Sequence, residues 1–254
     1  MSLKRFDKIK LLIKNWLPGA IMTTEMLLEQ GFSYSDIQRY LGSEWIEQVG
    51  HGAYKKYADV VNWQGSIHAL QGKVHIGGKS ALYLSNMGHY MNLGEPQIDV
   101  FSSEYINLPL WFKNNDWKAN VRHFNSNFLP EIAIDDFTIN NFVMKLSSPE
   151  RAALELMHFT NRVYSFNECK LLAENLTYLR PEIMQELLEK CTSIKAKRLV
   201  LYFAYSLQMG WYDKLNFNKI DLGKGYRKVE DCGEYDEKFK LMIPKTIHNE
   251  QLKF

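Results

Sequence analysis

Apolar residues recur at helical spacing near the N-terminus. Between residues 5 and 16 they return every three or four positions, with lysines on the other faces, which predicts an amphipathic helix. A second, shorter helix follows, with Thr23 or Thr24 as its N-cap and Gly31 at its end. These two segments predict a pair of small helices within the first 31 residues.

A third helix is predicted between Ser33 and Gly42. Serine is a favoured N-cap, and the apolar residues Tyr34, Ile37 and Leu41 form one stripe at helical spacing. We therefore expect these three side chains to face the core and the polar ones between them to face solvent.

Two short strands follow the third helix. Residues 45–49 and 53–57 are rich in β-branched and aromatic residues, and the turn Gly50-His51-Gly52 separates them. Three short helices followed by a hairpin is the order of a winged helix-turn-helix. We therefore assign residues 1–60 to a winged helix-turn-helix domain and read the segment that follows as a connector.

The rest of the chain mixes strands and helices without regular alternation. The clearest start is Ser148-Pro149-Glu150, where a serine cap, a proline at the first helical position and an acidic residue coincide. The pattern predicts an α+β fold: the N-terminal winged helix-turn-helix and a larger mixed α+β domain over residues 68–254. Strands are predicted at 73–76, 97–101, 119–124 and within 137–146, helices at 79–87, 149–157, 167–176, 181–192 and 195–209, and a closing hairpin of 228–232 with 239–243 around Gly233.

Composition narrows the functional classes. Lys+Arg 31 against Asp+Glu 29 gives a net charge of +2, so any nucleic-acid contact depends on local charge. The longest uninterrupted apolar run, Leu199 to Tyr205, is far shorter than the ~20 residues of a membrane span. Lys10 and Lys14 interrupt the apolar positions that a signal peptide would need. Three cysteines without a C-x-x-C motif fit a reduced protein, so we expect a cytoplasmic protein that does not contact membranes.

Motifs for catalysis are weak. Gly77-Gly78-Lys79-Ser80 ends like a phosphate-binding loop, but Lys73 stands where the first glycine of that motif belongs. A tight strand-to-helix turn explains the segment, and the scattered histidines show no metal-ligand spacing. Asp236-Glu237-Lys238 matches only a fragment of a nuclease pattern. We therefore expect neither a cofactor, a metal site nor catalytic residues.

Local charge favours DNA as the partner. The third helix offers donors suited to base edges and phosphates, the first helix is basic, and the hairpin carries further cations. The candidate DNA-binding residues are Lys8, Lys10, Lys14, Thr23, Thr24, Ser35, Gln38, Arg39, His51, Lys55 and Lys56. Two other functions stay open: a nucleic-acid enzyme with a nuclease-like C-terminal domain, and a non-catalytic protein-interaction adaptor.

Longer segments resemble a known family. The N-terminal match is Thr23-Thr24, Gly31 and residues 45–54; the others are residues 72–81, 108–112, 147–155, 197–204, Trp211, 220–227 and 233–244. Over about 220 residues the order of these segments resembles the AbiEi family of abortive-infection antitoxins, in the branch with an N-terminal winged-helix domain. His51 stands where the family's wing usually carries an arginine, so a permanent charge is missing there.

The resemblance implies a type IV toxin–antitoxin system. In such a system the antitoxin represses its own operon, and it counteracts a co-expressed nucleotidyltransferase-like toxin without a stable complex. Because one winged helix covers one half-site, we expect two copies on an inverted repeat of the operon promoter. The expected antitoxin surface is basic and consists of Lys195, Lys197, Arg198, Lys224, Arg227 and Lys228.

Overall fold

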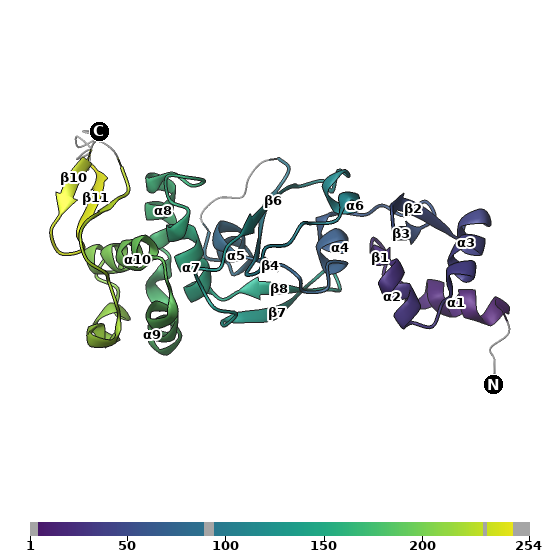
Figure 1. Ribbon diagram of the computed structural model, residues 1–254, viewed down its shortest axis with the longest axis horizontal. Helices are drawn as coiled ribbons and strands as arrows, with labels where there is room; N and C mark the ends of the chain where they lie inside the picture. The colour runs from purple at the N-terminus through teal and green to yellow at the C-terminus, as the bar shows by residue number, and fades with distance from the viewer. Residues whose placement is uncertain (1–4, 89–93, 231–232, 246–254) are drawn as a thin grey trace, which may run out of the picture. The chain divides into compact units, whose positions relative to one another are not determined.

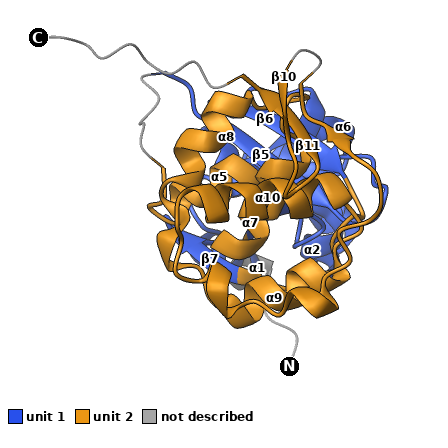
Figure 2. Ribbon diagram, turned by 90° about the vertical axis from the view of Figure 1, so that its left-hand side faces the viewer, with its two compact units in different colours: residues 1–75, 92–125, 136–146 blue, residues 76–91, 126–135, 147–254 orange. Residues whose placement is uncertain are grey.

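A computed structural model describes residues 5–88, 94–230 and 233–245. The chain forms two compact units (Figure 2). Unit 1 contains residues 1–75, 92–125 and 136–146, and unit 2 contains residues 76–91, 126–135 and 147–254. Helices and several sheets occur together, which confirms the predicted α+β class. The compact units do not divide at the boundary predicted between residues 60 and 68, because residues 1–75 share unit 1 with two later segments.

The first elements of unit 1 form a winged helix-turn-helix (Figure 1). A three-stranded antiparallel sheet of order β1-β3-β2 stands beside three helices, and β2 and β3 form the wing hairpin. The predicted helices and hairpin are confirmed. Their bounds are α1 Arg5–Asn15, β1 Met22–Thr23, α2 Thr24–Glu29, α3 Tyr34–Gly42, β2 Ile46–Gly50 and β3 Ala53–Lys56.

The predicted connector is part of the core of unit 1. It folds into α4 (Trp63–His68), in which Trp63 and Ile67 are buried. Gly65 packs against the backbone of the loop after α1, since a Cβ atom at this glycine would lie 1.9 Å from the Gly19 carbonyl oxygen. Residues 59–72 therefore connect the winged helix to the later elements of unit 1 through a short helix with a buried face.

A five-stranded sheet continues unit 1. Its order is β6-β5-β4-β8-β7, and β5 and β6 pair in parallel. Arg122 of β6 binds the buried carboxylate of Asp99 in β5 through two hydrogen bonds of 2.7 and 3.0 Å. Asn140 and Asn141 make the turn between β7 and β8 with positive φ, which suits asparagine. The bounds are β4 His75–Ile76, β5 Gln97–Ser102, β6 Asn120–Asn125, β7 Ile134–Ile139 and β8 Phe142–Ser147, and a short helix α6 Leu110–Lys113 was not predicted.

Unit 2 is mainly helical and is built around α7. Ser148 caps α7 through the Arg151 N–H, as its sequence predicts. The buried carboxylate of Glu155 accepts hydrogen bonds from Arg151 in the same helix, from the hydroxyl of Ser147 and from the N–H of Gly78. A buried carboxylate with this many donors is stable because each oxygen is paired. The helices are α5 Gly78–Leu84, α7 Pro149–His158, α8 Phe166–Ala173, α9 Pro181–Lys190 and α10 Ile194–Ser206, with short 3-10 turns η1 Leu176–Tyr178, η2 Tyr212–Lys214 and η3 Phe217–Lys219.

The predicted closing hairpin is wrong. Leu241–Pro244 (β11) pairs antiparallel with Gly233–Asp236 (β10) and parallel with Arg227–Lys228 (β9). Gly233 is a strand residue, paired with Pro244, rather than a turn residue. Glycine is needed there because a Cβ atom would lie 1.8 Å from the Ile243 carbonyl oxygen. The turn comes later, where the Asp236 carboxylate accepts the N–H of Phe239. Cys232, at the end of the predicted first strand, lies outside the described residues.

Two further observations concern the cysteines and the lengths of the helices. Cys169 and Cys191 are buried free thiols, and burial raises their pKa values to about 12 and about 11. Within the described ranges, no helix is both long and apolar enough to cross a membrane.

Candidate nucleic-acid interface

The helix-turn-helix is fixed by two capping boxes. The hydroxyl of Thr23 accepts the N–H of Met26 at the start of α2, and the hydroxyl of Ser33 accepts the N–H of Asp36 at the start of α3. Gly31, with a φ of +82°, makes the turn between the two helices. Thr23 and Ser33 therefore set where each helix begins. The predicted role of Thr23 as a cap is confirmed.

Helix α3 divides into a buried face and an exposed face. Asp36, Ile37 and Tyr40 are buried, whereas Tyr34 is 65% exposed. The predicted core stripe is therefore wrong at Tyr34, which is exposed, and Leu41 is only half-buried, because Tyr40 takes the core position one turn after Ile37. At 3.6 residues per turn the exposed residues form one continuous arc along the helix. This arc, which we call the reading face, consists of Tyr34, Ser35, Gln38 and Arg39.

The carboxylate of Asp36 holds the reading face in place. Its Oδ2 atom accepts hydrogen bonds from Lys8 of α1 at 2.8 Å and from the N–H of Ser33 at 3.0 Å. Its other oxygen pairs with the guanidinium of Arg39, one turn further along α3. The Lys8 ammonium first, and the Ser33 N–H second, hold the pKa of Asp36 well below its usual range. One nearly buried anion thus joins α1 to α3 and orients the arginine.

The three predicted lysines of α1 differ in their surroundings. Lys8 is half-buried in its ion pair with Asp36, so its charge serves the fold. Lys10 and Lys14 are exposed on the surface of α1. The prediction that all three lysines are available to phosphates needs correction at Lys8.

The wing lysines also have internal partners. Lys55 pairs with Glu47 across the hairpin at 2.9 Å and donates to the Asp59 carbonyl at 2.8 Å. Lys56 donates to the carbonyl of Trp16 at 3.0 Å. Both lysines are half-buried and have partners within the fold, and their contact with DNA stays a prediction. His51 is exposed at the tip of the wing, next to Gly52.

Thr24 lies where α2 meets the wing. Its N–H donates to the Gly52 carbonyl at 2.9 Å, so the start of α2 is bonded to the hairpin tip. Thr24 thereby positions the wing relative to the helix-turn-helix.

Two members of the predicted antitoxin surface lie inside unit 2. Lys197 and Arg198 are only 2% and 1% exposed, which excludes them from a surface. Arg198 donates to the carbonyls of Leu222, Gly223, Gly225 and Lys240 and so holds the glycine-rich segment. The segment wraps the guanidinium and supplies the acceptors that a buried cation needs.

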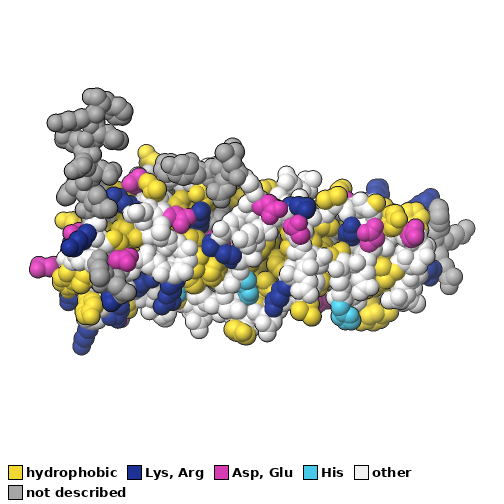
Figure 3. Space-filling model, turned by 90° about the horizontal axis from the view of Figure 1, so that it is seen from above, with side chains coloured by type: hydrophobic (Ala, Val, Ile, Leu, Met, Phe, Trp, Pro, Cys, Tyr) yellow, Lys and Arg dark blue, Asp and Glu magenta, His cyan; other side chains and the backbone are white. Residues whose placement is uncertain are grey.

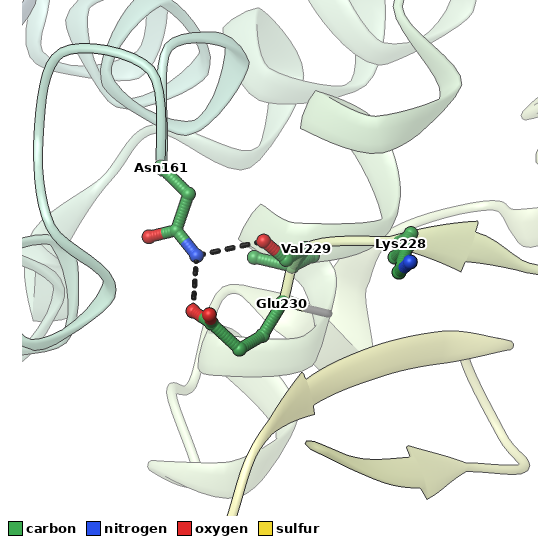
Figure 4. A pocket seen from close by; sticks show the side chains of 4 residues that line it. All are labelled: Asn161, Lys228, Val229 and Glu230. Carbon is green, nitrogen blue, oxygen red and sulfur yellow. Dashed lines mark hydrogen bonds between the residues drawn. The ribbon is translucent and has the colours of Figure 1, made fainter. Parts of the chain in front are cut away.

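The other four predicted residues keep some exposure. Lys195 is half-buried and donates to the Thr160 carbonyl at 2.7 Å, and its burial lowers its pKa to about 8. Arg227 is half-buried, whereas Lys224 and Lys228 are exposed. Lys228 lines a hollow of about 470 Å³, in which the Asn161 amide binds the Val229 carbonyl and the Glu230 carboxylate (Figure 4).

The weak catalytic motifs occupy structural positions. The N–H of Gly78, which a phosphate-binding loop would direct at its ligand, donates to Glu155 at 2.8 Å. Asp236 closes the turn before β11, and the Lys238 ammonium lies over the ring of Tyr205. Among the described residues, no group of three or more His, Cys, Asp or Glu side chains could hold a metal ion.

Comparison with known families decides the classification. One family model, described as the N-terminal domain of the AbiEi antitoxin transcriptional regulator, matches residues 5–93. A second, described as a transcriptional regulator and AbiEi antitoxin of a type IV toxin–antitoxin system, matches residues 95–244. The chain belongs to the AbiEi antitoxin family. The resemblance predicted from the sequence is thereby confirmed.

A solved structure shares the AbiEi fold seen here. The crystal structure of the RV2827C protein from Mycobacterium tuberculosis superposes with a TM-score of 0.54 at 14% identity, over 87% of this chain and 85% of that one. At this identity the likeness shows a common fold. No curated protein matches the sequence.

The sequence prediction was wrong for two residues of α3 in this AbiEi chain, one on the reading face and one that supports it. Tyr34 was assigned to the core because its spacing from Ile37 fits a helical stripe. Asp36 was counted as a solvated polar residue, although Ser33 three positions earlier signals a capping box, and Arg39 three positions later signals an ion pair. Both signals are local and could have been used.

We predict that Asp36→Asn lowers the free energy of unfolding by about 1–3 kcal/mol at pH 7, since Lys8 and Arg39 lose their shared anion. The pKa of Asp36 is depressed in the folded state, so its stabilisation is complete above the unfolded-state value of about 4 and declines as the pH falls below it. Urea unfolding from pH 7 to pH 3 should show the difference between wild type and variant shrinking at the acid end. Asp116→Asn, which removes an exposed pair with Lys118, is the control and should have a much smaller effect. An equal loss in both variants would contradict the assigned role of Asp36.

Proposed function

We propose that this AbiEi protein is a DNA-binding autorepressor of its own operon and an antitoxin that counteracts a co-expressed nucleotidyltransferase-like toxin. It acts by binding and carries out no catalysis. Two copies bind an inverted repeat in the operon promoter, because one winged helix covers one half-site. The observation that supports the proposed DNA binding is the reading face of α3, which is held in place by Asp36 on the buried face of the same helix.

The chemistry of the reading face suits a major groove. Gln38 and Arg39 carry the amide and guanidinium groups that form paired hydrogen bonds with adenine and guanine. Asp36 uses one edge of the Arg39 guanidinium, and the other N–H donors of that group remain for a base or a phosphate. The negative charge of Asp36 is paired with Lys8 and Arg39, so it does not add a net repulsion toward DNA.

Phosphate contacts come from scattered cations. Figure 3 shows basic and acidic side chains interspersed on one face of the molecule, without a large patch of one sign. With a net charge of +2, long-range attraction to DNA is weak. Binding therefore depends on individual residues such as Lys10 and Lys14, and a few phosphate contacts should set the salt dependence.

We predict that Arg39→Ala weakens binding to the promoter fragment by about 1–3 kcal/mol, because a paired hydrogen bond to a base is lost. Fluorescence anisotropy with the DNA upstream of the gene measures this, with a scrambled fragment of the same composition as the reference. Arg162→Ala removes an exposed arginine from unit 2 and should leave the affinity unchanged. If Arg39→Ala binds as tightly as wild type, Arg39 is not part of the site.

Lys14 and Lys8 lie on the same helix, and comparing their variants distinguishes a phosphate contact from a contribution to stability. We predict that Lys14→Met reduces the slope of log K against log salt by about 0.9, the value of one phosphate contact, on the promoter and the scrambled fragment alike. Lys8→Met should leave the slope unchanged and lower stability instead, because Lys8 serves Asp36. Titrations between 50 and 200 mM salt give both slopes. Equal flattening in the two variants would mean that Lys8 also meets DNA.

The antitoxin part of the proposal is assigned to the region of residues 95–244, which the antitoxin family model matches. Of the six cations predicted for the antitoxin surface, Lys197 and Arg198 are buried, Lys195 and Arg227 are half-buried, and Lys224 and Lys228 are exposed. We therefore centre the proposed working surface on Lys224 and Lys228, which lie on the glycine-rich segment and β9. They could bind a nucleic acid or an acidic surface of the toxin through the same charge.

We predict that the double variant Lys224→Glu and Lys228→Glu loses protection against the cognate toxin in cells but still represses the promoter. Arg39→Ala, the matched control, should lose repression and keep protection. Circular dichroism verifies that each full-length variant is folded. Full protection by the folded double variant would place the antitoxic surface elsewhere, and loss of both activities in Arg39→Ala would show that one site serves both.

A further inference from the structure

Tyr34 is the residue of the reading face whose chemistry differs from that of its neighbours. We propose that the ring of Tyr34 recognises the 5-methyl group of a thymine in the operator and so helps to determine its sequence. This inference rests on the proposed DNA-binding function and assigns that site a further specificity residue.

The position of Tyr34 supports a base contact. It is the first residue of α3, directly after the N-cap Ser33, and the N-terminal residues of a recognition helix are the ones that reach base edges. The helix start is fixed by hydrogen bonds in both directions: Ser33 accepts the N–H of Asp36 at 3.2 Å, and Asp36 accepts the N–H of Ser33 at 3.0 Å. The backbone that carries the ring is therefore set before DNA arrives.

The exposure of Tyr34 supports the same role. Its side chain is 65% exposed, whereas Ile37 and Tyr40 of the same helix are buried in the core. Trp45 and Tyr57, the other exposed aromatic residues nearby in sequence, flank the wing hairpin and do not belong to α3. Among the apolar residues of α3, the ring at its first turn is thus the one that the fold leaves most exposed to a ligand.

The neighbouring side chains leave this contact open. Gln38 and Arg39 suit adenine and guanine through hydrogen bonds, and Ser35 can donate to either. Thymine differs from the other bases in the major groove by its methyl group, which apolar side chains recognise. On the reading face, Tyr34 is the residue that offers a large apolar surface. The face therefore combines three hydrogen-bonding side chains with one large apolar ring.

Replacing thymine by uracil tests this contact, because the two bases pair identically and differ only in the methyl group. The full-length protein is titrated with the DNA fragment upstream of its gene, synthesised once with thymine and once with uracil throughout. Wild type should bind the uracil fragment about fourfold more weakly for each methyl group contacted, which is the value of one buried methyl group. Tyr34→Ala should bind both fragments equally. Tyr34→Phe should keep the wild-type ratio because it keeps the ring.

The outcomes distinguish this inference from the proposed function. Tyr178→Ala, which removes a tyrosine 89% exposed in unit 2, is the control and should keep the wild-type ratio. Specific binding with no preference for thymine, or a preference that Tyr34→Ala retains, overturns the inference and leaves the repressor function standing. Loss of the preference in Tyr34→Phe overturns it as well, because the hydroxyl group would then be the reader. If wild type binds the thymine fragment no better than a scrambled one, the proposed function fails and the inference fails with it.

Discussion

The carboxylate of Asp36 supports the surface that this protein presents to DNA. It lies on the buried face of α3 and accepts hydrogen bonds from α1, from the N-cap of α3 and from Arg39 on the exposed arc. A buried carboxylate is costly unless its oxygens are paired, and here the pairing fixes the helix start, the angle between two helices and the orientation of an arginine together. The positions of Tyr34, Gln38 and Arg39 follow from that single arrangement.

Unit 2 uses buried charge in a similar way. Glu155 joins the start of α5, the end of β8 and α7, and Arg198 holds the carbonyls of the glycine-rich segment. Each group has enough partners to offset the loss of water. Among the described residues, Arg151, Lys197 and Arg198 are thereby buried and withdrawn from any ligand. In this AbiEi protein many basic residues are part of the scaffold.

Much of the fold could be predicted because its signals are local. Thr23, Ser33 and Ser148 act as N-caps where the sequence places them, and the hairpin around Gly52 forms as its turn residues indicate. Long-range pairing could not be predicted. Gly233 resembles a turn residue in the sequence, but it lies in a strand, where the close Ile243 backbone leaves no room for a Cβ atom. The parallel pairing of β9 with β11 likewise has no local sequence signal, because the two strands are separated along the chain.

The candidate site was predicted less well, and the reason is the burial of cations. Lys197 and Arg198 at the start of an apolar helix resemble a solvated basic patch, and only the distant carbonyls that surround Arg198 reveal its position. Lys55 and Lys56 are neighbours in β3, yet both donate to backbone carbonyls, Lys55 to nearby Asp59 and Lys56 to distant Trp16. Partners separated by more than 20 residues decide the cases of Arg198 and Lys56. Gln38 and Arg39, by contrast, were predicted correctly as exposed because helical period alone sets their direction.

The central claim is that α3 enters a major groove in the promoter of the protein's own operon. Dimethyl sulfate footprinting tests it most directly, because the reagent methylates guanine N7 in the major groove and adenine N3 in the minor groove. With full-length protein on the DNA upstream of its gene, we expect protection of guanine N7 atoms in two half-sites about one helical turn, or a multiple of it, apart. Protection confined to adenine N3, or no protection at a concentration that saturates binding, would contradict the claim.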